Sequence, residues 1–322
     1  MSNYSTSILI TGGTQGLGFY CTQALARQCP STLIVIASRT DPDNAAAAIN
    51  KKLGQSNVQY MALDLGTMAK VRDFAKRWDA GNYPPIQALV LNAGIQFPGG
   101  IQYSDDGIEK TFAINHVGHA LLFHLLTPKL TKDARIVIVS SGVHDVDLKW
   151  GLKPAYTTPE EVARPSPQAV KKSSGRDRYA TSKTANALWT VALGRHISLN
   201  PDHKEKTVVA IDPGLMFPTR LLRDGAWGLK FLANNILPRM IPLLRILINS
   251  NINSPVESGG NLAWLAVGKE VKGSKGVYFE KRREHPVSKQ AQDIKLQEEL
   301  WQWTIDKVAS GVDEKERFAK IE

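Results

Sequence analysis

The sequence predicts an α/β fold, in which helices cover both faces of a parallel β-sheet. Three observations lead to this class. Strand-like and helix-like segments alternate along most of the 322 residues. Some strand-like segments, such as 32–38 (TLIVIAS) and 134–140 (ARIVIVS), contain an unbroken run of four or more apolar residues, which is typical of strands buried on both faces. A glycine-rich stretch, TGGTQGLG at 11–18, joins the first strand to the first helix.

The expected elements follow from two patterns. Short apolar runs rich in β-branched residues predict strands at 7–11, 32–38, 58–63, 86–91, 134–140, 207–211 and 276–279. Apolar residues at helical spacing predict helices at 16–29, 45–53, 68–78, 105–130, 177–199, 254–267 and 289–309. No linker or internal repeat divides the chain, so we expect a single domain over 1–322.

Two stretches depart from the alternation of strands and helices. Residues 142–175 form a polar insertion that contains prolines, and residues 215–253 form an irregular, mostly apolar excursion. Both leave the carboxyl ends of strands, where open α/β sheets bind their ligands. Long irregular segments inside a compact domain are usually functional or disordered. We therefore expect both stretches to lie near a ligand site.

Composition narrows the classes of function. The formal net charge is +10, but the charges are dispersed and no basic motif rich in aromatic residues occurs. This favours a basic surface suited to an anionic cofactor over a nucleic-acid partner. Cys21 and Cys29 have no metal-ligand spacing and make no disulfide framework, which fits a reducing, cytoplasmic location. We expect no signal peptide and no transmembrane helix.

The glycine-rich stretch has the surroundings of a phosphate-binding turn. It follows a strand and opens a helix, with the spacing Gly12-x-x-x-Gly16-x-Gly18. Glycine allows a backbone with positive φ and lets a ligand approach without a Cβ. The free N–H groups at the helix start favour a pyrophosphate. A tight turn with no ligand is the alternative interpretation.

The ends of the next strands indicate which cofactor binds. The second strand ends in Ser38 and Arg39, where folds that prefer the unphosphorylated cofactor often carry an acidic residue. Arginine can make two parallel contacts to a 2′-phosphate, so this position favours NADP(H). Asp64 ends the third strand and can bind an adenine amino group or cap the next helix. Small residues in Leu91-Asn92-Ala93-Gly94 allow the backbone to come close to the cofactor.

A second motif, YATSK at 179–183, carries candidate acid–base chemistry. Tyr179 and Lys183 are four residues apart, so they share one face of a helix. A lysine ammonium beside a phenol is expected to lower the pKa of the phenol and suit it to proton transfer. Asn115 lies within an expected helix, where asparagine is a poor helix former and implies a bent helix or a bound water. Ser140 and Ser141 end the fifth strand.

Taken together, these motifs resemble the short-chain dehydrogenase/reductase family over about residues 7–280. The matching elements occur in the family's order: TGGTQGLG at 11–18, Asp64, LNAG at 91–94, Asn115, Ser141, YATSK at 179–183 and Pro213-Gly214. NHVGHALL (115–122), YATSKTANAL (179–188) and SPVESGGNLAWLAV (254–267) resemble the branch that holds retinol dehydrogenases and protochlorophyllide reductases. The resemblance implies a Rossmann-type doubly wound sheet and an NADP(H)-dependent oxidoreductase.

The resemblance also implies a role for each matching residue. Tyr179 would be the general acid that protonates the carbonyl oxygen, and Lys183 would lower its pKa and hold the nicotinamide ribose. Ser141 would bind the substrate oxygen, and Asn115 would position a water linking Lys183 to solvent. The expected cofactor contacts are Gly12, Thr14, Gln15, Gly16, Leu17, Gly18, Ser38, Arg39, Asp64, Leu65, Asn92, Ala93, Gly94, Tyr179, Lys183, Pro213, Gly214 and Thr219.

The sequence departs from the family pattern at three points. Gln15 stands where many NADP-preferring members have a basic residue, so Arg39 carries that preference nearly alone. Pro218 takes the place where the family often has its threonine, and Thr219 follows it. Ser141 and Tyr179 are 38 residues apart, which is longer than in the short members.

The excursion at 215–253 is expected to form a lid over an apolar substrate. Substrate contacts are expected from Met216, Phe217 and Trp227, and from His144, although polar or structural roles are favoured for the histidines near the site. No histidine has a partner at metal-ligand spacing, so no metal is expected. Residues 226–250 are too charged and proline-rich to span a membrane, but peripheral membrane contact is an alternative to the lid. The resemblance implies a homo-oligomer paired through the helices at 105–130 and 177–199.

The sequence therefore predicts an enzyme that interconverts a carbonyl and an alcohol on an apolar small molecule. Two alternatives stay open. One is reduction of an activated C=C bond, and the other is a cofactor-binding regulatory or scaffold protein without turnover. The presence of Asn115, Ser141, Tyr179 and Lys183 speaks against the second alternative.

Overall fold

The computed structural model describes residues 4–148, 150–216, 237–247 and 249–322. Its main sheet has eight strands in the order β10-β9-β6-β5-β4-β1-β2-β3. The strands are β1 (Ser7–Thr11), β2 (Leu33–Ser38), β3 (Val58–Ala62), β4 (Ile86–Leu91), β5 (Leu130–Val139), β6 (Thr207–Asp212), β9 (Lys275–Glu280) and β10 (Arg283–Glu284). All neighbours pair in parallel except β9 and β10. This confirms the predicted doubly wound α/β class.

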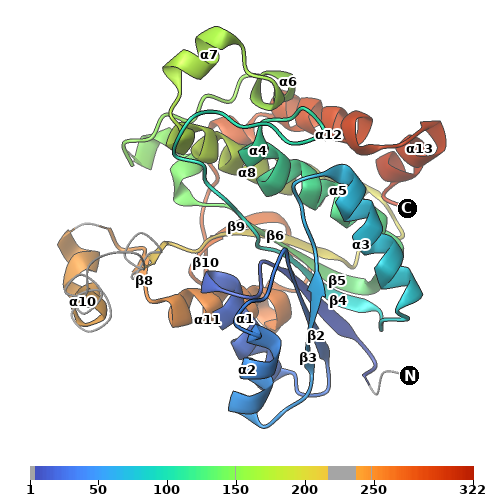
Figure 1. Cartoon of the computed structure of the whole chain (residues 1–322). Helices are drawn as coiled ribbons and strands as arrows, with labels where there is room; N and C mark the ends of the chain where they lie inside the picture. Colours follow the sequence, from blue (N-terminus) through green and yellow to red (C-terminus); the bar gives the residue numbers. More distant parts are fainter. Residues whose placement is uncertain (1–3, 149, 217–236, 248) are drawn as a thin grey trace.

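Helices cover both faces of the sheet (Figure 1). One face carries α1 (Gly16–Gln28), α2 (Ala45–Leu53) and α11 (Pro255–Val267), and the other carries α3 (Met68–Ala80), α5 (Gly118–Leu126), α8 (Gly175–Leu199) and α12 (Ile294–Val308). Two apolar clusters, one on each face, exclude water from the strands. The close approach of α1 and α11 depends on Gly259, where a Cβ would lie 2.5 Å from the Cβ of Tyr20.

The order of the strands reverses between β1 and β4. The chain winds outward from β1 through β2 to β3, then crosses back to β4 and continues through β5 and β6 to β9. In such sheets the crevice beyond the carboxyl ends of the two central strands is where ligands bind. The glycine-rich turn follows β1, so the fold places that turn at this crevice.

The helix expected at 105–130 is shorter and interrupted in the structure. It begins as α4 (Lys110–Phe112), passes through a π-helical segment η1 (Ala113–Val117), and continues as α5 to Leu126. Glu109 caps its start by accepting a hydrogen bond from the Phe112 amide at 2.8 Å. A short 3₁₀ turn that contains Pro128 ends it, so β5 begins at Leu130, four residues earlier than expected.

The insertion at 142–175 is more regular than its sequence suggested. It contains two 3₁₀ turns, η3 (Gly142–His144) and η4 (Val146–Leu148), and two short helices, α6 (Pro159–Ala163) and α7 (Pro167–Lys172). Thr158 and Ser166 cap α6 and α7, and a proline follows each cap. This cap-and-proline pattern is a recognisable start signal for a helix.

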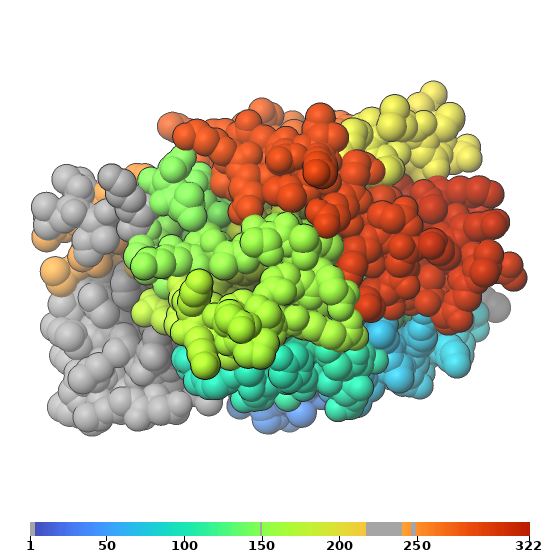
Figure 2. All heavy atoms as spheres, turned by 90° about the horizontal axis from the view of Figure 1, so that it is seen from above, coloured from blue at the N-terminus to red at the C-terminus, as the bar shows by residue number. Residues whose placement is uncertain are grey.

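The carboxyl-terminal segment covers the face on which we expected an oligomer to form. The Trp303 indole on α12 donates to Glu160 of α6 at 2.8 Å, and the His196 ring of α8 stacks on Trp301 of α12 with centroids 4.3 Å apart. Figure 2 shows the insertion and the carboxyl-terminal helices side by side on one face. α12 thus packs along α8, and pairing of two chains through α5 and α8 stays a prediction. The helix α13 (Val312–Lys320), which follows, was not expected.

The excursion at 215–253 is described at its two ends. Its first strand β7 (Leu215–Met216) pairs in parallel with β8 (Ile252–Asn253), so the chain leaves and returns at one place. The helix α10 (Leu237–Leu247) precedes β8. The expected lid residues 217–236, which include Phe217, Thr219 and Trp227, lie outside the described residues.

Candidate active site

The glycine turn leaves space beside its backbone. Gly12 and Gly16 have φ of +69° and +55°, a conformation that favours glycine. A Cβ on Gly18 would overlap the Gly12 carbonyl oxygen, whereas a Cβ on Gly16 would meet no atom within 4 Å. Gln15 is the N-cap residue of α1, and its side chain does not cap the helix. The turn therefore fits a phosphate, which would accept hydrogen bonds from the amides that begin α1.

The end of β4 is fixed against the turn by hydrogen bonds. The Thr11 hydroxyl accepts from the amides of Asn92 and Ala93, both at 2.9 Å. The Asn92 side chain donates to the Thr11 carbonyl at 2.7 Å. A Cβ on Gly94 would lie 3.5 Å from the Lys183 Nζ atom. The expected cofactor contacts at 92–94 thus lie between the glycine turn and the candidate catalytic lysine.

The end of β2 carries the residues expected to select the cofactor. Arg39 is exposed, and the buried Ser38 hydroxyl has no hydrogen-bond partner within the described part of the chain. Asp64 accepts from the Gly66 amide at 2.9 Å and forms an ion pair of 2.8 Å with Lys70. The hydrogen bonds from Lys70 and Gly66 hold the pKa of Asp64 below its usual value despite some burial. Lys70 therefore adds a cation near Arg39 that the sequence did not point to.

The remaining expected contacts near the turn are largely enclosed by the fold. Thr14, Leu17 and Leu65 are buried. Leu65 packs in the apolar cluster beneath α5, and its carbonyl oxygen lies against Gly118, where a Cβ would come within 2.5 Å of it. The side chain of Leu65 is therefore part of the core, and only its backbone can face a ligand.

Lys183 is buried and held by the backbone of β5. It is 2% exposed, and its ammonium donates to the Val139 carbonyl at 2.8 Å. The same ammonium lies 5.5 Å from the centre of the Tyr179 ring. Burial lowers the pKa of Lys183 to about 8, and the Asp212 carboxylate opposes this shift. The lysine is thus mostly cationic at neutral pH but close to losing its proton.

Tyr179 titrates differently from what the motif suggested. Burial raises the pKa of Tyr179 to about 12, and the Asp212 carboxylate acts in the same direction. Lys183 was expected to lower this pKa, but its ammonium points to a backbone carbonyl rather than to the phenol oxygen. Tyr179 therefore carries its proton at neutral pH and has one to donate.

Asn115 lies in the π-helical segment η1, which explains an asparagine at that place. A π-bulge is frequent at functional sites and lets a side chain leave the regular helix surface. Its amide oxygen accepts from the Ile95 amide at 2.8 Å, and its amide nitrogen donates to the Ile95 carbonyl and to the Ser182 hydroxyl, both at 3.0 Å. The irregular helix we expected is present, and it ties α8 to the loop after β4.

Ser140 and Ser141 have different surroundings at the end of β5. The Ser140 hydroxyl donates to the Lys183 carbonyl at 2.9 Å, so it is a structural contact. Ser141 is the N-cap residue of η3, and its side chain does not cap that turn. His144 is buried, with Nδ1 at 2.7 Å from the Ser141 carbonyl and Nε2 accepting from the Ser288 amide at 3.1 Å. Both ring nitrogens of His144 are thus in use, and contact of this ring with a substrate stays a prediction.

Asp212 joins the site although the sequence analysis did not single it out. It is 6% exposed at the end of β6 and accepts from the Gly214 amide at 3.0 Å and the Asn251 side chain at 2.9 Å. A Cβ on Gly142 would lie 2.6 Å from one of its oxygens. Its charge raises the pKa of Tyr179 and Tyr278, and it partly offsets the lowering of the Lys183 pKa by burial. An acidic residue directly before Pro213-Gly214 at a strand end was the available signal.

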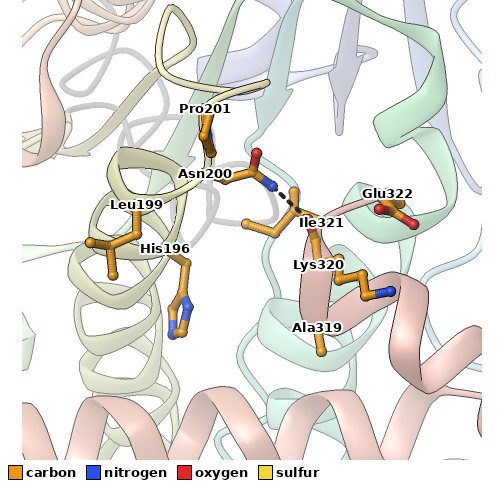
Figure 3. A pocket seen from close by; sticks show the side chains of 8 residues that line it. All are labelled: His196, Leu199, Asn200, Pro201, Ala319, Lys320, Ile321 and Glu322. Carbon is orange, nitrogen blue, oxygen red and sulfur yellow. Dashed lines mark hydrogen bonds between the residues drawn. The ribbon is translucent and has the colours of Figure 1, made fainter.

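Two surface hollows lie away from this constellation. One, of about 360 Å³, is lined by residues of the last turn of α8 and of the carboxyl terminus, including His196, Asn200 and Ile321 (Figure 3). Tyr179 and Leu199 are 20 residues apart on α8, which corresponds to about 30 Å along a helix. The other hollow, of about 530 Å³, is lined by residues of β9 and of the segment after it. Neither is lined by the tyrosine–lysine pair.

Two further findings concern metals and membranes. The described residues contain no group of three or more histidine, cysteine, aspartate or glutamate side chains arranged to hold a metal ion. None of the described helices is both long and apolar enough to cross a bilayer. The charged side chains that interact beside Tyr179 are those of Lys183 and Asp212.

Comparison with known proteins shows what the chain resembles. Residues 6–158 match the family model described as short chain dehydrogenase. The chain is 29% identical over 309 residues to the Brassica napus short-chain dehydrogenase TIC 32 B, covering 94% of this chain and 88% of that protein. It is 29% identical over 301 residues to a polyprenol dehydrogenase of Danio rerio, covering 91% of this chain and 83% of that protein.

Two further comparisons support the branch and the fold. Human retinol dehydrogenase 14 is 28% identical over 315 residues, covering 92% of this chain and 84% of that protein, which confirms the resemblance to retinol dehydrogenases. The solved structure of L-sorbose reductase from Gluconobacter frateurii, complexed with NADPH and L-sorbose, has the same fold, with a TM-score of 0.61 and 17% identity over 86% of this chain and 95% of that one. These comparisons support the resemblance to the short-chain dehydrogenases/reductases, including the branch that holds retinol dehydrogenases.

Proposed function

We propose that the chain is an NADP(H)-dependent oxidoreductase that interconverts a carbonyl and an alcohol on an apolar small molecule. The observation that carries this proposal is the meeting of two groups of residues at the β1–β4 crevice. A glycine turn with room for a phosphate lies on one side, and Tyr179 and Lys183 lie on the other. Gly94 connects the two sides, because a Cβ there would lie 3.5 Å from the lysine.

The residues of the first side fit a dinucleotide. Gly12, Gly16 and Gly18 allow the backbone to approach the pyrophosphate, and Ala93 and Gly94 leave space for the nicotinamide half. When bound, the cofactor supplies or accepts the hydride. Arg39 would hold a 2′-phosphate with Lys70 beside it, since Arg39 directly follows β2 and the two cations interact electrostatically near Asp64. This favours NADP(H) over NAD(H).

The residues of the second side move a proton. In the direction of reduction, Tyr179 donates its phenolic proton to the carbonyl oxygen, which becomes the alcohol oxygen. Its raised pKa keeps that proton in place at neutral pH until an oxyanion develops. The Ser141 hydroxyl would donate a second hydrogen bond to the same oxygen. The buried Lys183 ammonium stabilises the phenolate that remains after the transfer.

The substrate class follows from relatives and from the surface beside Ser141. The names of two relatives denote action on polyprenol and retinol, which are apolar alcohols. In this chain, Val146 and Leu148 of η4 are 59% and 42% exposed shortly after Ser141. Met216 at the end of β7 is half-buried. An apolar aldehyde or ketone would cover these side chains.

Consumption of cofactor tests the proposal directly. The purified protein is mixed with NADPH or NADH and a panel that contains farnesal, retinal, aliphatic ketones and quinones, and the products are identified by mass spectrometry. We expect NADPH-dependent reduction of at least one apolar aldehyde or ketone to its alcohol. A saturated C–C product would instead indicate a C=C reductase. NADPH binding without turnover on any compound would contradict the proposed activity.

A further inference from the structure

We propose that His119 is a positioning residue, a neutral imidazole protonated on Nδ1 that holds the Asn115 carbonyl in the π-helical segment and joins it to the glycine turn. The proposal extends the proposed function, because the segment it holds belongs to the catalytic side of the site. His119 is 3% exposed on α5 and lies one helical turn after Asn115.

The hydrogen bonds of Thr11 determine the tautomer of His119. The Thr11 hydroxyl accepts from the amides of Asn92 and Ala93, both at 2.9 Å. A hydroxyl has two acceptor positions and one proton, so both acceptor positions are filled. The His119 Nε2 atom lies 2.8 Å from the same oxygen, closer than the Val90 carbonyl at 3.4 Å. Thr11 therefore donates its proton to Nε2, and Nε2 carries no hydrogen.

The other ring nitrogen of His119 then has to carry the proton. Nδ1 lies 3.1 Å from the Asn115 carbonyl oxygen, which can only accept. The ring therefore donates through Nδ1 and accepts through Nε2, so neither nitrogen is left to form another hydrogen bond. Burial lowers the pKa of His119 to about 4, and the nearby Lys183 ammonium adds to this shift, so the ring stays neutral at physiological pH.

The position of this bond explains why it matters. Gly118 donates its amide hydrogen to the Ala113 carbonyl, five residues back, so the helix ladder is shifted by one residue at η1. The His119 side chain adds a bond to this irregular segment from outside the ladder. Asn115 in turn holds Ile95 and Ser182. One imidazole thus connects the end of β1, the end of β4 and the segment that faces Lys183.

His144 offers a parallel within the same site. Its Nε2 accepts from the Ser288 amide at 3.1 Å, which leaves Nδ1 to donate to the Ser141 carbonyl at 2.7 Å. Two candidate catalytic residues thus have their backbone carbonyls held by the Nδ1–H group of a buried histidine. By contrast, His124 on α5 has no hydrogen-bond partner for either ring nitrogen among the described residues, and it stacks on Phe318 with centroids 4.6 Å apart.

Nitrogen NMR tests the tautomer without requiring turnover. The protein is labelled with ¹⁵N-histidine, and the His119 signals are assigned by their loss in His119→Asn. We expect the pattern of a neutral Nδ1–H ring that does not titrate between pH 5.5 and 8.5. An Nε2–H tautomer, or a ring that becomes charged in this range, would overturn the proposal.

Two variants of His119 test the positioning role. Asparagine places an N–H donor near the Nδ1 position and keeps the bond to Asn115, whereas glutamine reaches the Nε2 position and keeps only the contact to Thr11. With NADPH and farnesal, we expect kcat to fall about tenfold or more in His119→Gln and to stay within about threefold in His119→Asn. The KM for farnesal should change little in either variant. Equal losses in both variants would contradict the role of the Asn115 bond.

A control and a second readout separate this inference from the proposed function. His124→Gln places the same substitution on the same buried helix, and we expect lower stability with unchanged kcat. The ¹³C carbonyl signal of Asn115 should move in His119→Gln and stay near its place in His119→Asn. If the wild type reduces no aldehyde, the proposed function fails, and the tautomer and the carbonyl signal still decide the inference about His119.

Discussion

The two sides of the site differ in what forms them: one consists mainly of backbone atoms and the other mainly of side chains. The cofactor side is mainly backbone: glycines without a Cβ at Gly12 and Gly18, and amides at the start of α1. The catalytic side is made of side chains, among them Asn115 and Lys183, each held by backbone groups of another element. A phosphate needs space and N–H groups, whereas proton transfer needs functional groups at fixed distances. One side is therefore specified locally, and the other only by the folded chain.

The largest effect expected on cofactor binding comes from a change in the backbone side. In Gly18→Ala the new methyl group overlaps the Gly12 carbonyl oxygen, and overpacking costs about 1–3 kcal/mol. We expect the affinity for both NADPH and NADH to fall, up to about 100-fold. Calorimetry measures the affinity for each cofactor. Gly260→Ala on α11, where a Cβ meets open space, is the control and should bind as the wild type does. Wild-type affinity in Gly18→Ala would show that the turn does not approach the cofactor.

A narrower change tests the selectivity of the cofactor side. Removing the Arg39 guanidinium in Arg39→Ala should weaken NADPH about tenfold, since charged hydrogen bonds contribute about 1.5–3 kcal/mol and this side chain is exposed. NADH, which lacks the 2′-phosphate, should bind unchanged. Lys295→Ala, an exposed cation on α12 across the sheet, controls for net charge. Equal losses for the two cofactors would remove Arg39 from the phosphate site.

The catalytic side makes a prediction about pH. Burial places the pKa of Lys183 at about 8, below its usual value, so the ammonium is lost as the pH rises through 8. Tyr179, at about 12, keeps its proton throughout. We expect kcat/KM for carbonyl reduction to be level near pH 7 and to fall by about tenfold per pH unit well above pH 8. A rate that is constant or rising from pH 7 to 10 would assign no catalytic part to the lysine.

The smallest expected effect is a loss of folding stability and concerns neither the cofactor side nor the catalytic side. Glu314 pairs with Arg72 at 2.6 Å and anchors α13, and the hydrogen bonds from Arg72 lower the pKa of Glu314 to about 2. The stabilisation is present above the usual carboxyl pKa and is lost as the pH falls toward 2. At neutral pH, Glu314→Gln should lower the free energy of unfolding by about 1 kcal/mol. Thermal unfolding measures the loss, and kcat should not change. A kinetic effect would link α13 to the site.

The positions of the residues on the proposed cofactor side could be predicted from the sequence. The turn at 11–18 and the small residues at 92–94 are contiguous motifs, and the alternation of strands and helices places both at one edge of the sheet. The tyrosine–lysine pair was predicted for the same reason, because helical spacing puts the two residues on one face. Local geometry determines all of these features, so a short stretch of sequence is enough to recognise them.

The rest depends on contacts between distant parts of the chain. The lysine was expected to lower the pKa of Tyr179, but burial raises that pKa, and the ammonium donates to the Val139 carbonyl, 44 residues away. Asp212 gains its place through Asn251, 39 residues further along. The bond between His119 and Thr11 spans 108 residues. The periodicity of the sequence does not predict such hydrogen bonds, because their partners come together only when the sheet assembles.

The most direct measurement compares the wild type with Tyr179→Phe. Both proteins are assayed for NADPH binding by calorimetry and for NADPH-dependent reduction of the best aldehyde or ketone. Phenylalanine keeps the ring and removes only the hydroxyl, so the account predicts unchanged NADPH affinity and a loss of turnover of about 1,000-fold or more. Turnover within tenfold of the wild type, with NADPH still bound, would contradict Tyr179 as the proton donor.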